Sequence, residues 1–355
     1  MKITACHLHR ADVPLSRPYA VASHANDTAR MALVRLATDG AHVGVGAATP
    51  EPEVNGDTGD AAFAGLQAFA ERFVGRAVEA PAAFAPLLAE IGSPGARAAF
   101  DIALHDLHAR TLGRPLVEVL GRAHTALPTS VTIGVRDVAA TLAEAREYLA
   151  RGFRVLKVKI GVDVEIDVER LVRLRELVGC GIAIRVDGNV GYGPPQLLRF
   201  LQATRDLGIE FIEQPLPRTG IDAQRVLPAA VKARLMADES LHDVADARGQ
   251  CREPRAFGLF NIKLMKCGGV LPARAIAALA DDAGIGLMWG CMDESRIAIA
   301  AALHAALSCP ATRYLDLDGH LDLSRDFASG GFDLTDGVLR TLDRPGLGVT
   351  VDAPW

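Results

Sequence analysis

The second half of the chain repeats one unit, in which a short run rich in β-branched residues is followed by a loop and a helix-like stretch. Eight such runs occur, from SVTIG at 130–134 to RYLDLDG at 313–319. Equivalent acidic residues recur at nearly constant intervals, 26 residues from Asp187 to Glu213 and 25 from Glu213 to Asp238. Because parallel neighbouring strands need a helical crossover of about this length, the repeat predicts a (β/α)8-type barrel.

The first part of the chain has a different pattern and predicts a separate α+β domain. Two strand-like stretches, KITACHLHRADVPL at 2–15 and RMALVRLATDGAHVGVGAATP at 30–50, precede a mostly helical region that includes ARAAFDIALHDLHARTLG at 96–113. We expect this domain to span residues 1–122 and the barrel to span 123–325. The remaining segment, 326–355, is expected to pack back on the first domain.

Composition and charge favour a small molecule as the partner. Of the 355 residues, 50% are hydrophobic and 23% are charged, and the net charge of -5 comes without a run of Lys or Arg that would predict nucleic-acid or membrane binding. The N-terminus has no apolar signal-peptide core, and the six cysteines are scattered without metal-binding spacing. We expect a cytoplasmic protein with reduced thiols and no nucleic-acid or membrane partner. We also expect a homo-oligomer.

Three carboxylates stand at the ends of three successive predicted strands. They are Asp187, Glu213 and Asp238, each at the same place in its unit. Functional groups of such barrels lie at the C-terminal ends of the strands, so these side chains should converge. Clustered carboxylates repel one another and need a cation, and ligation by oxygen alone favours a hard divalent ion. The sequence therefore predicts a Mg²⁺ site.

Lysines occupy two strands that should face each other across the barrel mouth. Lys157 and Lys159 share one face of the second run, VLKVKIG, and Lys263 lies on the sixth. Lys159 and Lys263 would flank a substrate α-carbon, one removing the α-proton and the other returning it on the opposite face. This arrangement predicts a racemase or epimerase in which the metal stabilises an enediolate.

Three further residues are expected to support this chemistry. The ammonium group of Lys157 would make Lys159 a better base near neutral pH. Asn189, in RVDGN, and Glu239, beside Asp238, are the other two.

The ordered motifs resemble the muconate lactonizing subgroup of the enolase superfamily, and within it the dipeptide epimerases. The matching stretches are KVK at 157–159, RVDGN at 185–189, FIEQPL at 211–216, MADES at 236–240, NIKLMKCGG at 261–269, GCMDES at 290–295 and YLDLDG at 314–319. The resemblance covers nearly the whole chain. It implies an α/β fold: a (β/α)7β TIM-like barrel with an N-terminal α+β capping domain, completed by the C-terminal tail. It also implies Mg²⁺ on the three carboxylates and acid/base roles for Lys159 and Lys263.

The resemblance to dipeptide epimerases rests on the pair Asp316 and Asp318. In that group a DxD pair on the last strand binds the N-terminal ammonium of the substrate, and residues at i and i+2 share a face of a strand. Thr132, on the first strand, matches a position that members of this family use near the substrate. A dipeptide is therefore the expected substrate, with 1,1-proton transfer at the α-carbon of its C-terminal residue.

Three residues bear on which dipeptide is preferred. In members that act on Ala-Glu, an arginine in an early loop binds the glutamate side chain, and His24 stands at that place here. Imidazole holds a carboxylate less well than a bidentate guanidinium. Glu51 and Asp293 are expected to line the side-chain pockets, where two carboxylates would suit cationic residues such as Lys or Arg.

Other readings of the same motifs stay open. They include an Ala-Glu epimerase and different reactions through the same enediolate, namely those of a cycloisomerase, an o-succinylbenzoate synthase or an N-acylamino acid racemase. The DxD pair argues against these last three, because their substrates lack a free ammonium. From a different class, a barrel lysine could form a Schiff base in a metal-free aldolase.

Overall fold

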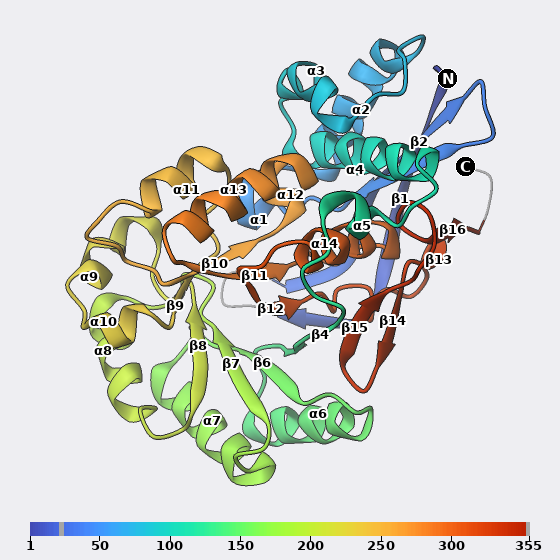
Figure 1. Cartoon of the computed structure of the whole chain (residues 1–355). Coiled ribbons are helices and arrows are strands. Elements are labelled where there is room, and N and C mark those ends of the chain that lie inside the picture. Colours follow the sequence, from blue (N-terminus) through green and yellow to red (C-terminus); the bar gives the residue numbers. More distant parts are fainter. Residues whose placement is uncertain (21–24, 353–355) are drawn as a thin grey trace.

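The computed structural model describes residues 1–20 and 25–352 and consists of an α+β part lying against a barrel (Figure 1). The first part begins with an antiparallel sheet of β1 (Ile3–Ala20), β2 (Ala25–Thr38) and β3 (Val43–Ala48). The helices that follow it are α1 (Pro52–Asn55), α2 (Gly59–Phe73), η1 (Pro81–Phe84), α3 (Ala85–Ala89), α4 (Pro94–Thr111) and α5 (Leu116–Leu120). The predicted antiparallel sheet followed by helices is confirmed.

Helix α4 packs on β3 at unusually close range because of two glycines. A Cβ atom on Gly44 would overlap the carbonyl oxygen of Ala103, and one on Gly46 would overlap that of Ala99. The GVG sequence at 44–46 therefore lets a helix backbone approach a strand backbone. The same helix contacts α12 (Leu264–Cys267) and α13 (Val270–Asp282) of the barrel, so it holds the two parts together.

Eight parallel strands form the barrel, in the spatial order in which they occur in the chain. They are β5 (Val131–Ile133), β6 (Val155–Lys159), β7 (Ala183–Asp187), β8 (Ile209–Glu213), β9 (Leu235–Ala237), β10 (Leu259–Ile262), β11 (Gly286–Gly290) and β12 (Thr312–Asp316). A parallel bridge between Thr129 and Leu315 brings the first strand beside the last. The eight predicted strand runs and the barrel-like fold are confirmed.

Helices follow most of these strands and surround the sheet (Figure 1). They are α6 (Val138–Ala150), α7 (Val164–Val178), α8 (Pro194–Ala203), η2 (Arg218–Gly220), α9 (Asp222–Arg225), α10 (Ala229–Lys232), α11 (Val244–Gln250), α12, α13 and α14 (Arg296–Leu307). Among the residues described, none of the helices is long and apolar enough to cross a membrane.

The strand register places the functional residues at one level. Lys159 on β6 pairs with Asp187 on β7, which pairs with Glu213 on β8. Below this level the barrel interior is filled by Phe211, Met236, Leu259 and Met288. Because side chains two apart on a strand share a face, this apolar layer lies directly under the polar one. The site is therefore built on a packed floor.

The C-terminal segment adds two small sheets. Its strands are β13 (Ala328–Gly330), β14 (Phe332–Thr335), β15 (Val338–Thr341) and β16 (Val349–Val351), and β15 also pairs with β4 (Leu127–Pro128). Asp106 of α4 accepts a hydrogen bond from the backbone N–H of Leu347 at 2.8 Å, and the Arg110 side chain donates to the carbonyl of Val349 at 3.0 Å. These contacts support a tail that returns to the first domain, and the boundaries at 122 and 325 stay a prediction.

Candidate active site

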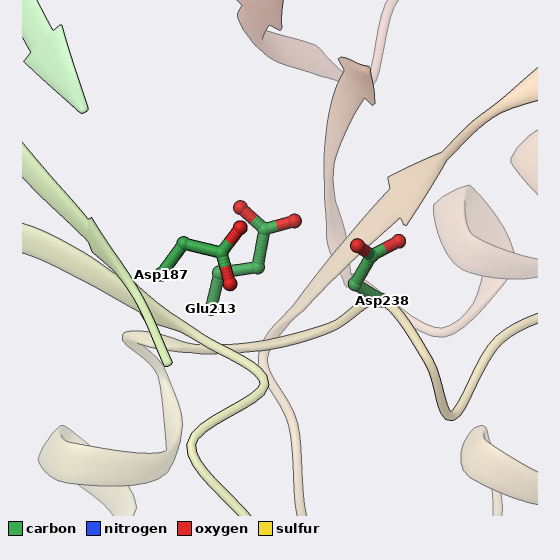
Figure 2. Close-up of side chains that lie close together, drawn as sticks. All are labelled: Asp187, Glu213 and Asp238. Carbon is green, nitrogen blue, oxygen red and sulfur yellow. The ribbon is translucent and has the colours of Figure 1, made fainter. Parts of the chain in front are cut away.

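Three buried carboxylates meet at the ends of β7, β8 and β9. Asp187, Glu213 and Asp238 each offer an oxygen within 4.8 Å of the other two (Figure 2). All three side chains are fully buried. Burial and the neighbouring Asp187 raise the pKa of Glu213 to about 8. This set of oxygens, drawn together away from water, fits a hard divalent cation such as Mg²⁺.

Two lysines stand on opposite sides of this cluster. The Nζ of Lys159 on β6 lies 2.7 Å from Asp187 Oδ2, and the Nζ of Lys263, which follows β10, lies 2.8 Å from Asp238 Oδ2. In the eight-stranded order β6 is second and β10 is sixth, so the two strands are opposed across the barrel. Both lysines line the same pocket. The structure thus places one amine on each side of the carboxylate cluster.

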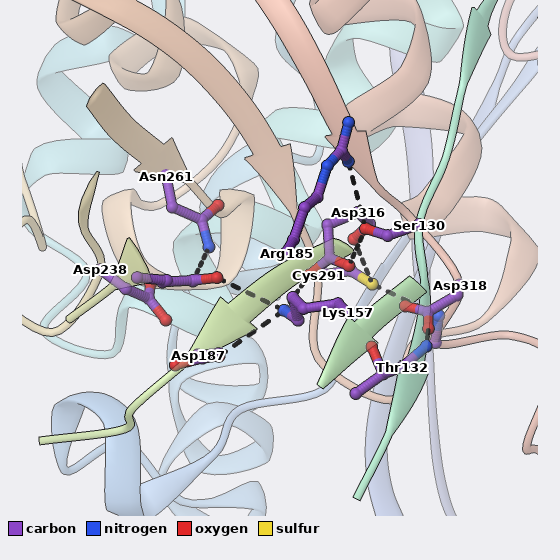
Figure 3. A network of polar contacts seen from close by, with 12 residues as sticks. Ser130, Thr132, Lys157, Arg185, Asp187, Asp238, Asn261, Cys291, Asp316 and Asp318 are labelled. Carbon is purple, nitrogen blue, oxygen red and sulfur yellow. Dashed lines mark hydrogen bonds and ion pairs between the residues drawn. The ribbon is translucent and has the colours of Figure 1, made fainter. Parts of the chain in front are cut away.

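Lys157 connects the carboxylate cluster to the last strand (Figure 3). Its Nζ lies 3.5 Å from Glu213 Oε2 and 3.6 Å from Asp187 Oδ2, and it also forms an ion pair with Asp316. Burial alone would lower the pKa of Lys157, but these carboxylates outweigh burial and raise it well above its usual range. The side chain is therefore a fixed cation between two groups of acids.

The two aspartates of the DxD pair have different surroundings. Asp316, at the end of β12, accepts a hydrogen bond from Ser130 Oγ at 2.6 Å in addition to its ion pair with Lys157. Asp318 accepts a hydrogen bond from the backbone N–H of Thr132 at 2.7 Å. Burial and the nearby Asp316 raise the pKa of Asp318 to about 7. Of the two aspartates, Asp318 is therefore the one whose charged form an additional cation would stabilise more.

A pocket between the first domain and the barrel gathers most of the predicted site residues. Those that line it are Lys157, Lys159, Lys263, Asn189, Thr132, Asp316, Asp318, Glu51 and Asp293. Glu239 is held beside the pocket by a hydrogen bond from Asn189 Nδ2 at 3.2 Å. Burial and the neighbouring Asp238 raise the pKa of Glu239 to about 7. His24 lies outside the described residues.

Comparison with known families agrees with this geometry. Residues 3–121 match the N-terminal domain of the mandelate racemase / muconate lactonizing enzyme family, and residues 140–355 match the family described as enolase C-terminal domain-like. The chain belongs to the enolase superfamily. The carboxylates and lysines described above, at the ends of the barrel strands, all lie within the second matched region, residues 140–355.

Two curated relatives are similar to this enolase superfamily member over nearly their whole length. An L-Lys-D/L-Arg epimerase from Methylococcus capsulatus is 54% identical, over 98% of this chain and 99% of the relative. An L-Ala-D/L-Glu epimerase from Clostridium acetobutylicum is 33% identical, over 95% of each chain. Among solved structures, a dipeptide epimerase from Methylococcus capsulatus complexed with Mg and the dipeptide L-Arg-D-Lys has a TM-score of 0.96 at 53% identity, covering 99% of this chain and 100% of that one.

Several residues of this superfamily member complete the site although the sequence motifs gave them no role. Lys266 forms an ion pair with Asp238, and Asn261 Nδ2 donates to Glu213 Oε1 at 2.6 Å. Lys266 stands three residues after Lys263 in a short helix, a spacing that could have signalled a second amine on that side. Asn261 is two residues before Lys263 on the same run, so strand alternation could have found it.

Arg185 lies under the DxD pair, and its place in the RVDGN motif gave it no role of its own. Its Nη1 donates to the carbonyl of Leu315 at 2.9 Å and approaches Ser130 Oγ at 3.3 Å (Figure 3). The guanidinium also stacks 4.7 Å from the ring centroid of Tyr314. Arg185 therefore fixes the backbone of β12 directly before Asp316, which makes it a positioning residue.

Proposed function

We propose that the chain is a Mg²⁺-dependent dipeptide epimerase that inverts the α-carbon of the C-terminal residue of its substrate. The observation that carries this proposal is the placement of Lys159 and Lys263 on opposed strands, with the carboxylate cluster between them. The DxD pair at the end of the same pocket adds a place for the substrate's free ammonium. The names of the relatives agree with this activity.

The proton transfer falls to the chain's own lysines. One lysine removes the α-proton from one face of the substrate, and the other donates a proton to the opposite face, which inverts the centre. Mg²⁺ held by Asp187, Glu213 and Asp238 would offset the negative charge that develops on the substrate carboxylate. Asp318 orients the ammonium, while Lys157 and Arg185 keep the last strand in place.

The preferred substrates are dipeptides with cationic side chains. Glu51 and Asp293 both line the pocket, and the most similar relatives described above act on or bind Lys and Arg residues. Carboxylates at the wall of a partly buried pocket favour cationic side chains and disfavour an acidic one. The homo-oligomeric state, the cytoplasmic location and the absence of nucleic-acid or membrane partners stay predictions.

A screen of L,L-dipeptides in D2O with Mg²⁺ tests the proposed function. We expect one deuterium to enter the α-carbon of the C-terminal residue, and we expect dipeptides that contain Lys or Arg to react fastest. Mass spectrometry of fragments would locate the label. Uptake confined to Ala-Glu would contradict the cationic preference, and a screen without uptake in any dipeptide would contradict the epimerase activity itself.

The ammonium subsite is tested by Asp318→Asn together with a substrate whose N-terminus is acetylated. The variant is expected to lose about 10- to 100-fold in kcat/KM for free dipeptides, because a charge-assisted hydrogen bond to a buried ammonium is worth about 1.5–3 kcal/mol. The wild-type protein should turn over the acetylated dipeptide poorly, and Asp318→Asn should reduce this discrimination. The matched control is Asp333→Asn on β14, where the side chain is exposed. Equal wild-type rates for both substrates would favour the N-acylamino acid alternative.

A further inference from the structure

The pocket wall beside Asp318 is assembled from segments that lie far apart in the sequence. After β12 the chain turns back, with the N–H of Leu321 donating to the carbonyl of Asp318 at 2.8 Å. The carbonyl of Asp322 then accepts a hydrogen bond from the N–H of Ser16 at 2.7 Å, which ties this loop to β1 of the first domain. The turn places Asp322 on the lining of the same pocket as Asp318.

Arg17, the arginine that lines this pocket, is already paired with carboxylates other than Asp322. Arg17 of β1 lies 3.2 Å from Glu144 and 2.8 Å from Glu147, both on α6. Arg136 Nε lies 2.8 Å from the second oxygen of Glu144. These ion pairs hold the guanidinium of Arg17 toward α6, which leaves less of its charge directed into the pocket.

Asp322 differs from the other acids of this wall. Its carboxylate has neither a hydrogen bond nor an ion pair with any side chain of residues 1–17 and 27–352, or with any N–H group of the described ranges 1–20 and 25–352. Burial raises the pKa of Asp322 even though Arg17 is near, so the charged form has lost hydration that no protein group fully replaces. A half-buried carboxylate at the wall of a pocket is suited to an incoming cation.

We propose, on the basis of the dipeptide epimerase function, that Asp322 binds the cationic side chain of the substrate's N-terminal residue. The ammonium of that residue is assigned to Asp318, four residues before Asp322. Its side chain is attached to the same α-carbon as the ammonium, so it starts beside Asp318. Asp293 and Glu51 line the same pocket, and we assign them to the side chain of the C-terminal residue.

Asp322→Asn separates this role from a general one when it is measured on matched substrates. We expect kcat/KM for L-Lys-L-Lys to fall about 5-fold, mostly through KM, because a partly exposed charge pair contributes up to about fivefold in affinity. The value for L-Ala-L-Lys should change less than about twofold, since alanine does not reach Asp322. The ratio of the two values in one preparation does not depend on the folded fraction. Asp322→Glu, which keeps the charge, should retain more of the preference than Asp322→Asn.

The control is Glu176→Gln, which removes an exposed carboxylate of α7 that pairs with Arg173, and neither of these residues lines the pocket. It is expected to leave the ratio between L-Lys-L-Lys and L-Ala-L-Lys unchanged. An unchanged ratio in Asp322→Asn, or an equal loss on both substrates, would overturn the assignment of Asp322 while leaving the epimerase activity in place. A wild-type protein without deuterium uptake on either dipeptide would overturn the proposed function and this inference together.

Discussion

Lys159→Ala and Lys263→Ala are each expected to lower the rate of epimerisation by about 10²- to 10⁴-fold, the usual contribution of a positioned general acid or base. The two variants should not be equivalent in D2O. Each retains the lysine on one face, so each should still exchange the α-proton of the epimer that presents its proton to that face. Exchange without inversion, in opposite epimers for the two variants, is the expected signature of two bases on opposed strands.

Proton NMR of the two dipeptide epimers in D2O measures exchange and inversion together. Lys2→Ala, a substitution at an exposed lysine of the first domain, is the control and should keep the wild-type rates. Loss of exchange from both epimers in one variant but not the other would contradict a two-base site. It would indicate instead that a single lysine removes the α-proton from both epimers.

The site residues that the sequence revealed are those at repeated positions in the barrel unit. Asp187, Glu213 and Asp238 recur at nearly equal intervals, and because each unit adds one strand, equal spacing becomes equal height in the barrel. Lys159 and Lys263 could be paired for the same reason, since strand number alone fixes which strands are opposed. The eight strands and the antiparallel sheet of the first domain also followed from local patterns.

Residues whose partners lie far away in the sequence could not be predicted in this way. Arg17 meets Glu144 and Glu147 about 130 positions later, and Asp322 reaches the pocket because a loop of the barrel is bound to β1. Such contacts depend on how the first domain sits on the barrel, which no periodicity encodes. The role of Arg185 could not be predicted for another reason. It lies on the strand that ends in Asp187, so its charge would be attributed to the metal site and not to β12.

Lys157 shows how the charges of the site depend on one another. Its ion pairs join the carboxylate cluster to Asp316, so the last strand and the third and fourth strands share one buried cation. Removing one charged group from such a network leaves the remaining charges buried without an opposite charge beside them. Both lysines of KVK project to one face of β6, where Lys159 lines the pocket and Lys157 stabilises the acids around it.

Removal of the divalent cation is expected to have the largest effect of all. Treatment with EDTA should abolish turnover, and added Mg²⁺ should restore it in the wild-type protein but not in Glu213→Gln. An α-proton beside a carboxylate is very weakly acidic, and a bound metal supplies several kcal/mol of charge stabilisation, which corresponds to about 10³-fold or more in rate. Glu213 has the central place in this cluster, because its strand β8 lies between the strands of the other two ligands.

Isothermal titration calorimetry of Mg²⁺ into metal-free protein gives a readout that does not depend on turnover. Binding should be clear for the wild-type protein, lost or strongly weakened in Glu213→Gln, and retained in Glu169→Gln, which removes an exposed carboxylate of α7. If activity survived chelation and borohydride trapped a covalent adduct on a barrel lysine, the metal-free Schiff-base aldolase would replace the epimerase as the better account. If Glu213→Gln bound Mg²⁺ as tightly as the wild-type protein, the carboxylate cluster would not be the metal site, because a neutral amide at its centre weakens ligation of a hard cation.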